Sequence, residues 1–75
     1  MNDLDSYAIH VTFFERGYWS KSYTYKSKNP YLIGDIVIVP ANDFYAVGKV
    51  TGAEKGYNFK ENINYKFVIQ AIKPK

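Results

Sequence analysis

The sequence predicts an all-β fold, namely a small, SH3-like, partly open barrel of about five antiparallel strands. Two segments near the N-terminus alternate in polarity with period two, which is typical of half-buried strands. Further along, four β-branched residues, Ile36 to Val39, follow the turn residues Gly34-Asp35 and precede Pro40. No segment shows a helical period, so we expect strands to be the only regular elements.

The two alternating segments, residues 7–14 and 18–26, are predicted to pair as an antiparallel hairpin. Lys21 shares the aromatic face of the second segment, so its ammonium group must extend to water or follow a bulge. The connecting residues Glu15-Arg16-Gly17 include a glycine that suits a positive φ. The apolar faces consist of Tyr7, Ile9, Val11 and Phe13 in the first segment and Trp19, Tyr23 and Tyr25 in the second.

The β-branched run is predicted to be a central strand that is covered on both faces and ends at Pro40. The connection before it, residues 27–33, contains the turn signal Asn29-Pro30. We expect its apolar end to fold back over one end of the barrel. The residues concerned are Tyr31, Leu32 and Ile33.

Two further strands complete the predicted sheet. Residues 46–51 form the first, in which Gly48 indicates a bend or a close backbone approach. Residues 52–62 are the longest polar loop, and residues 63–72 are the last strand. The predicted core, taken from the apolar faces, consists of Ile9, Val11, Tyr23, Tyr25, Val37, Val39, Val50, Phe67 and Ile69.

The length of 75 residues predicts a single domain, 1–75, with loose termini at 1–6 and 73–75. A chain of this size buries only about 60% of its unfolded surface, and the absence of cysteine excludes disulfides and thiolate metal sites. No apolar run approaches a membrane span and no apolar leader is present, so we expect a soluble, cytoplasmic protein with no membrane partner. The net charge of +3 permits a nucleic-acid partner without requiring one.

The residue types needed for catalysis are scarce. His10 is the only histidine and lies within a predicted strand, where it is expected to be a cross-strand neighbour. Without cysteine or a second histidine a zinc site is not expected, and no glycine-rich phosphate loop occurs. We therefore predict that the protein is not an enzyme and takes no cofactor.

Aromatic residues and lysines outside the core pattern are the candidate binding residues. Bases stack on aromatic faces while lysines contact phosphates, so a small barrel that presents both can hold a single strand. Two other interpretations stay open, namely loop aromatics that plug the barrel ends and lysines that are merely solvated. The candidates for nucleic-acid or partner binding are Tyr18, Lys21, Lys49, Lys55, Tyr57, Phe59, Lys60 and Lys66.

Phe44 and Tyr57 flank the 46–51 strand in the two adjoining loops. We expect Phe44 to plug the barrel, because it has no hydroxyl to face water and adjoins the strand directly. We expect Tyr57 to be exposed on a loop that contains Gly52 and Gly56.

Several motifs resemble those of known families. They are Tyr23-Thr24-Tyr25-Lys26, the G-D-I-V-I-V-P run 34–40, Val47-Gly48-Lys49-Val50 and the Y-K-F-V-I run 65–69. This pattern is similar to small phage and prophage proteins of unassigned role. It also resembles the N-terminal DNA-binding domain of the primosomal replication-restart helicase, which implies a small barrel that holds the 3′ end of a DNA strand. The chain departs from that domain at Ala41-Asn42-Asp43 and in its longer 52–62 loop.

The leading functional prediction is a non-catalytic binding module for nucleic acid, specifically single-stranded or strand-end DNA, encoded by a phage or prophage and acting in a bacterial cell. The alternative is a protein-interaction module that binds and modulates a larger host enzyme. Salt dependence discriminates between them, because phosphate contacts weaken steeply as ionic strength rises.

Overall fold

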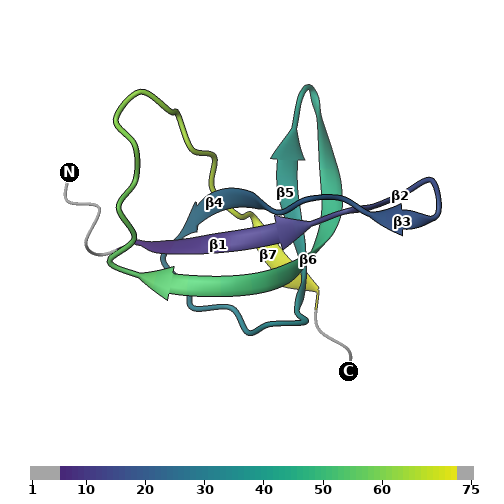
Figure 1. Ribbon diagram of the computed structural model, residues 1–75, viewed down its shortest axis with the longest axis horizontal. Helices are drawn as coiled ribbons and strands as arrows, with labels where there is room; N and C mark the ends of the chain where they lie inside the picture. Colours follow the sequence, from purple (N-terminus) through teal and green to yellow (C-terminus); the bar gives the residue numbers. More distant parts are fainter. Residues whose placement is uncertain (1–5, 73–75) are drawn as a thin grey trace.

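The structure is a computed structural model that describes residues 6–72, in which strands and loops are the only elements (Figure 1). Five strands form an antiparallel sheet in the order β4-β1-β6-β5-β7, and β2 and β3 form a separate two-stranded ribbon. The all-β prediction is confirmed. The strands are β1 (Tyr7–Thr12), β2 (Phe14–Glu15), β3 (Tyr18–Trp19), β4 (Tyr23–Ser27), β5 (Ile36–Ala41), β6 (Phe44–Lys55) and β7 (Gln70–Ile72).

The predicted N-terminal hairpin is confirmed, although each of its strands is divided in two. β1 pairs with β4 in antiparallel register, and β2 pairs with β3 in a ribbon that projects from the body of the molecule (Figure 1). Between them, the Ser20 amide donates to the Phe13 carbonyl at 2.7 Å. Arg16 and Gly17 both have positive φ, 52° and 90°, as a type I′ turn requires. Of the loose termini predicted at 1–6 and 73–75, residues 1–5 and 73–75 lie outside the described residues, and Ser6 is buried, so the prediction is wrong at that residue.

β5 lies inside the sheet between β6 and β7, but only one of its faces is fully covered. Val37 and Val39 are completely buried, whereas Ile36 and Ile38 on the other face are half-buried. The prediction of cover on both faces is therefore wrong. Pro40 does not end the strand, because β7 pairs only with residues 36–38 and β5 is an edge strand beyond that point. Proline is tolerated on such an edge.

The 27–33 connection covers the core with Tyr31 alone. Tyr31 packs against the core as expected, but Leu32 and Ile33 are largely exposed, so that part of the prediction is wrong. Leu32 is held in a tight turn with Asp35, since each backbone amide bonds to the other residue at 3.0 Å. Gly34 has φ of 97° inside this turn, and the side chains of Leu32 and Ile33 are exposed on it.

β6 is longer than predicted and joins the two halves of the sheet. It pairs with β5 at one end and β1 at the other, and Figure 1 shows it bending between them. Gly48 is buried at the bend, where a Cβ atom would overlap Val11 Cγ1 and lie 3.0 Å from the Thr12 carbonyl oxygen. The close approach predicted at Gly48 is confirmed. A register shift follows between His10 and Val11, and the Thr51 hydroxyl donates to the His10 carbonyl there.

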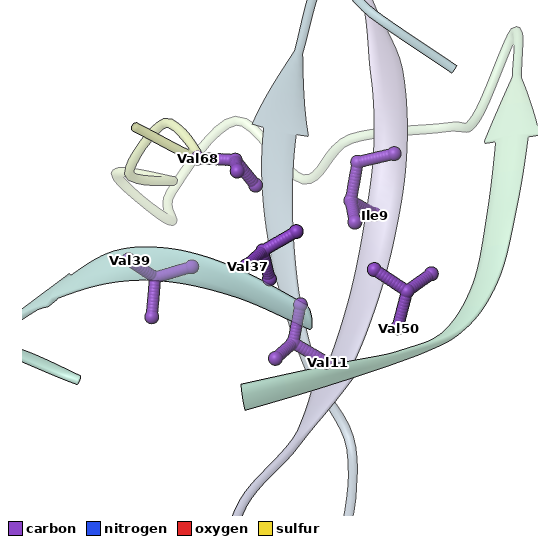
Figure 2. Close-up of a cluster of buried hydrophobic side chains, with 6 residues drawn as sticks. All are labelled: Ile9, Val11, Val37, Val39, Val50 and Val68. Atoms are coloured by element: carbon purple, nitrogen blue, oxygen red, sulfur yellow. The ribbon is translucent and has the colours of Figure 1, made fainter. Parts of the chain in front are cut away.

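The core is a compact aliphatic cluster shared by β1, β5, β6 and the segment before β7 (Figure 2). Most of the predicted core residues are confirmed there, and Tyr25 packs against the cluster while half-buried. Tyr23, Phe67 and Ile69 are nearly half exposed, so their assignment to the core is wrong. The cluster consists of Ile9, Val11, Val37, Val39, Val50 and Val68.

The last predicted strand, 63–72, is a strand only at its end. Upstream of β7, Phe67 makes an isolated parallel bridge to Lys26 of β4, and the Ile69 amide donates to the Ile38 carbonyl of β5 at 2.9 Å. The segment therefore crosses from one edge of the sheet to the other and turns Val68 inward instead of its two neighbours. Within the described residues the sheet does not close into a barrel, because this bridge alone links its edges.

The close approach at Gly48 predicts a specific loss of stability. Gly48→Ala should lower the free energy of unfolding by about 1–3 kcal/mol, because the added methyl group forces apart β6 and β1. Gly52→Ala in the same strand, β6, is the matched control, since its Cβ would lie 3.4 Å from His10 Cδ2 of β1, an ordinary contact. Urea denaturation of both variants measures the difference, and equal unfolding free energies would contradict the packing described here.

Candidate functional site

A basic groove of about 710 Å³ runs between β4, the end of β5 and the 60–66 segment. Its charged residues are lysines, and tyrosine rings lie among them. Within the described part of the chain, no Asp or Glu lines this groove. The basic groove is defined by Lys21, Lys60, Lys66, Tyr23, Tyr25 and Tyr65.

One wall of the basic groove is β4 and the residues that lead into it. Tyr23 and Tyr25 are two residues apart, which places them on the same face of the strand. Lys21 precedes them in the loop after β3, and its Nζ lies 5.4 Å from the Tyr23 ring centroid. Lys21 therefore lies in a loop between β3 and β4, where a bulge or an extended side chain was expected, and it lines the groove.

The opposite wall is the 60–66 segment, which is held by backbone bonds to β4. The Lys26 amide donates to the Lys66 carbonyl, and the Lys26 carbonyl accepts from the Val68 amide, both at 2.9 Å. The Lys60 amide donates to the Tyr65 hydroxyl at 3.2 Å. Lys60, Tyr65 and Lys66 are thereby fixed opposite the tyrosines of β4.

An aromatic ladder organises the loop that leads into this wall. Tyr57 contacts Phe59 and Phe59 contacts Tyr65 in edge-to-face geometry, with ring centroids 5.0 Å and 4.9 Å apart. Lys26 Nζ lies 4.8 Å from the Phe59 centroid. Tyr57 and Phe59 are half-buried by these contacts, so they shape the loop more than they offer free faces.

The expectations for Phe44 and Tyr57 are both wrong. Phe44 is 77% exposed at the start of β6, because the β5–β6 hairpin extends beyond the sheet. It therefore plugs nothing. Tyr57 is half-buried against His10, with ring centroids 5.5 Å apart. Because β6 is longer than predicted and the loop after it packs on His10, Phe44 is exposed and Tyr57 is half-buried, which is the reverse of the expectation.

His10 is a cross-strand neighbour, as predicted. Its Nε2 lies 2.6 Å from Glu54 Oε2 on β6, and its Nδ1 lies 2.9 Å from Thr24 Oγ1 on β4. An ionised carboxylate only accepts, so Nε2–H donates to Glu54, and Nδ1 shares a hydrogen bond with the Thr24 hydroxyl. His10 thus ties three strands together through its side chain.

The other candidate residues lie outside the basic groove. Lys49 Nζ stands 4.1 Å from the Trp19 ring centroid, and Tyr18 is exposed on the same β2–β3 ribbon. Lys55 Nζ lies 5.9 Å from the Tyr7 ring centroid at the end of β6. Among the eight candidates, the groove brings together Lys21, Lys60 and Lys66.

Sequence reasoning missed the tyrosines of the basic groove. The alternation pattern predicts Tyr23 and Tyr25 on an apolar strand face, and it places Tyr65 within the last predicted strand. The available signal was the lysines beside them in sequence, since Lys26 adjoins Tyr25 and Lys66 adjoins Tyr65. Burial raises the pKa of Tyr25 above its ordinary value of 10.0, and the nearby Tyr23 raises it further. Its phenol is therefore neutral in the physiological range and can donate a hydrogen bond.

No three His, Asp or Glu side chains within residues 6–72 are grouped so that they could hold a metal ion. The same residues include no helix that is long and apolar enough to span a membrane. The chain matches no known protein-family model, and no curated protein or solved structure is significantly similar to it. The resemblance set out from the sequence therefore stays a prediction.

The raised pKa of Tyr25 predicts an alkaline loss of stability. Its contribution is fully present below pH 10.0, the unfolded pKa, and is lost as pH rises through the higher folded pKa. Tyr25→Phe removes this group, so its unfolding free energy should fall less than that of the wild type above pH 10.0. Urea denaturation at a series of pH values tests this, with Tyr18→Phe on an exposed ring as the control. Parallel pH profiles for wild type and Tyr25→Phe would contradict the assignment.

Proposed function

We propose that this protein is a non-catalytic binding module for nucleic acid, with single-stranded or strand-end DNA as its ligand. The observation that carries the proposal is the basic groove, where Lys21, Lys60 and Lys66 stand among tyrosine rings without an acidic residue in its described lining. A groove that presents both lysines and aromatic rings suits a flexible nucleic-acid strand better than a small neutral ligand.

The lysines and the tyrosines of the groove each match one part of a single-stranded nucleic acid. Lysine ammonium groups attract phosphates without reading sequence. Tyrosine rings offer faces on which bases stack, each worth roughly 1–3 kcal/mol. Tyr25 lines the groove, and its neutral phenol adds a hydrogen-bond donor to the lining.

The proposal includes no catalytic step. His10, the single histidine, is engaged by Glu54 and Thr24 at 2.6 Å and 2.9 Å and does not line the basic groove. A cytoplasmic location in a bacterial cell, and a phage or prophage origin, belong to the proposal as well. They are supported by the absence of cysteine and by the resemblance of the motifs.

A second candidate function is favoured by the two projecting hairpins. Aromatic side chains on the β2–β3 ribbon and the β5–β6 hairpin are exposed, which is typical of a surface that binds protein. In this case the protein would bind and modulate a larger host enzyme. The side chains are Phe14, Tyr18, Trp19, Phe44 and Tyr45.

The lysine content of the groove predicts the effect of a charge reversal. Lys60→Glu should weaken binding of a fluorescent oligonucleotide of about 12 nucleotides by roughly tenfold at low salt, because it removes a charged contact worth about 1.5 kcal/mol. Lys55→Glu is the matched control, since it makes the same change in charge outside the groove. Fluorescence anisotropy measures both affinities. Equal affinities for the two variants would remove the groove from the proposal.

The salt dependence of the same titration tests the two candidate functions. Each lysine–phosphate contact on a single strand contributes about −0.7 to the slope of log K against log salt, so the three groove lysines predict about −2. Lys60→Gln should reduce the size of this slope by about 0.7. A protein that shows no binding to the oligonucleotide, but captures a purified protein partner independently of salt, would favour the second candidate.

A further inference from the structure

An aromatic cleft adjoins the basic groove. It encloses about 540 Å³ between β2, β4 and the β5–β6 hairpin. Tyr23, Tyr25 and Ala41 line both hollows, so the two are neighbours. A ligand that lies across these shared residues can occupy the groove and the cleft at the same time.

The walls of this aromatic cleft include aromatic rings. Phe14 lines the cleft and is 58% exposed, and Tyr23 lines it with its ring centroid 5.9 Å from that of Phe13. Val47 is also exposed in the lining. A flat aromatic ligand gains most from such walls, because its faces stack on the rings and release water.

The polar residues of the two hollows have opposite character. Glu15 is the charged residue among those that line the aromatic cleft, and Asn42 also lines it. The basic groove has lysines instead. A phosphate is therefore repelled from the cleft and attracted to the groove, whereas an uncharged base can enter the cleft. This difference fixes which part of a nucleotide faces which hollow.

We propose that the aromatic cleft is a base-binding subsite that selects bases carrying an amino group, guanine first, on a strand whose phosphates lie in the basic groove. The inference rests on the proposed function. The Glu15 carboxylate only accepts hydrogen bonds, and guanine presents two adjacent donors, its N1–H and its 2-amino group. Cytosine and adenine present one amino group, and thymine presents only its N3–H between two oxygen acceptors. Glu15 is thus a specificity-determining residue.

The experiment compares oligothymidines of about 12 nucleotides that differ at one central position, which is thymine, guanine, cytosine, adenine or an abasic site. Wild-type protein should bind the strand with guanine about tenfold more tightly than the all-thymine strand. Glu15→Gln should remove most of that preference, because glutamine both donates and accepts, while it leaves affinity for the all-thymine strand equal or higher. Phe14→Ala should weaken binding of the guanine strand by roughly tenfold through lost stacking.

The possible outcomes separate the subsite from the groove. Equal wild-type affinity for all five strands, or a guanine preference that survives Glu15→Gln, overturns the subsite and leaves the proposed function standing. Unchanged oligonucleotide affinity in both Phe14→Ala and Glu15→Gln also overturns it. Absence of binding to every strand overturns the proposed function itself. Thermal denaturation controls for folding, and Glu15→Gln keeps the test valid if Phe14→Ala is unstable, because Glu15 is exposed.

Discussion

Two backbone hydrogen bonds of Lys26 hold the segment that leads into β7 against β4. Through them the 66–68 segment docks on the edge of β4, with the Lys66 carbonyl and the Val68 amide each 2.9 Å from their Lys26 partners. Val68 is thereby buried in the core. Lys66 and Tyr65 are placed across from the tyrosines of β4, so the same contact forms the basic groove. It also covers part of an edge that would otherwise present unpaired backbone groups.

The loop between β6 and this docking point has little regular structure, and side chains hold it together. The Tyr57–Phe59–Tyr65 ladder is anchored on His10 at one end and accompanied by the Lys26 ammonium group at the other. Edge-to-face pairs contribute about 0.5–1.5 kcal/mol each beyond the area they bury. The wall of the groove therefore depends on aromatic contacts outside the aliphatic core, and its local stability is separate from that of the sheet.

Sequence periodicity predicted the hairpin, the β5 strand and the close approach at Gly48, because these features are set by local alternation and by the absence of a side chain. It failed over residues 63–69, where the pattern alternates like a strand but the segment crosses between β4 and β5. Local alternation carries no information on which partner a segment meets. For the same reason the sequence predicted each candidate lysine individually, but only the tertiary fold shows that Lys21, Lys60 and Lys66 line one groove.

The distribution of aromatic residues bears on function more directly than their number. The chain has eight Tyr, five Phe and one Trp, which could have compensated for a small core. The buried cluster is nevertheless built from Ile and Val alone, and the described aromatic side chains are half-buried or exposed. A small domain that left these rings in water would forgo burial energy it needs, at roughly 25 cal/mol for each Å² of apolar surface. A ligand that buries these rings when it binds would explain why they are concentrated around the basic groove, the aromatic cleft and the two hairpins.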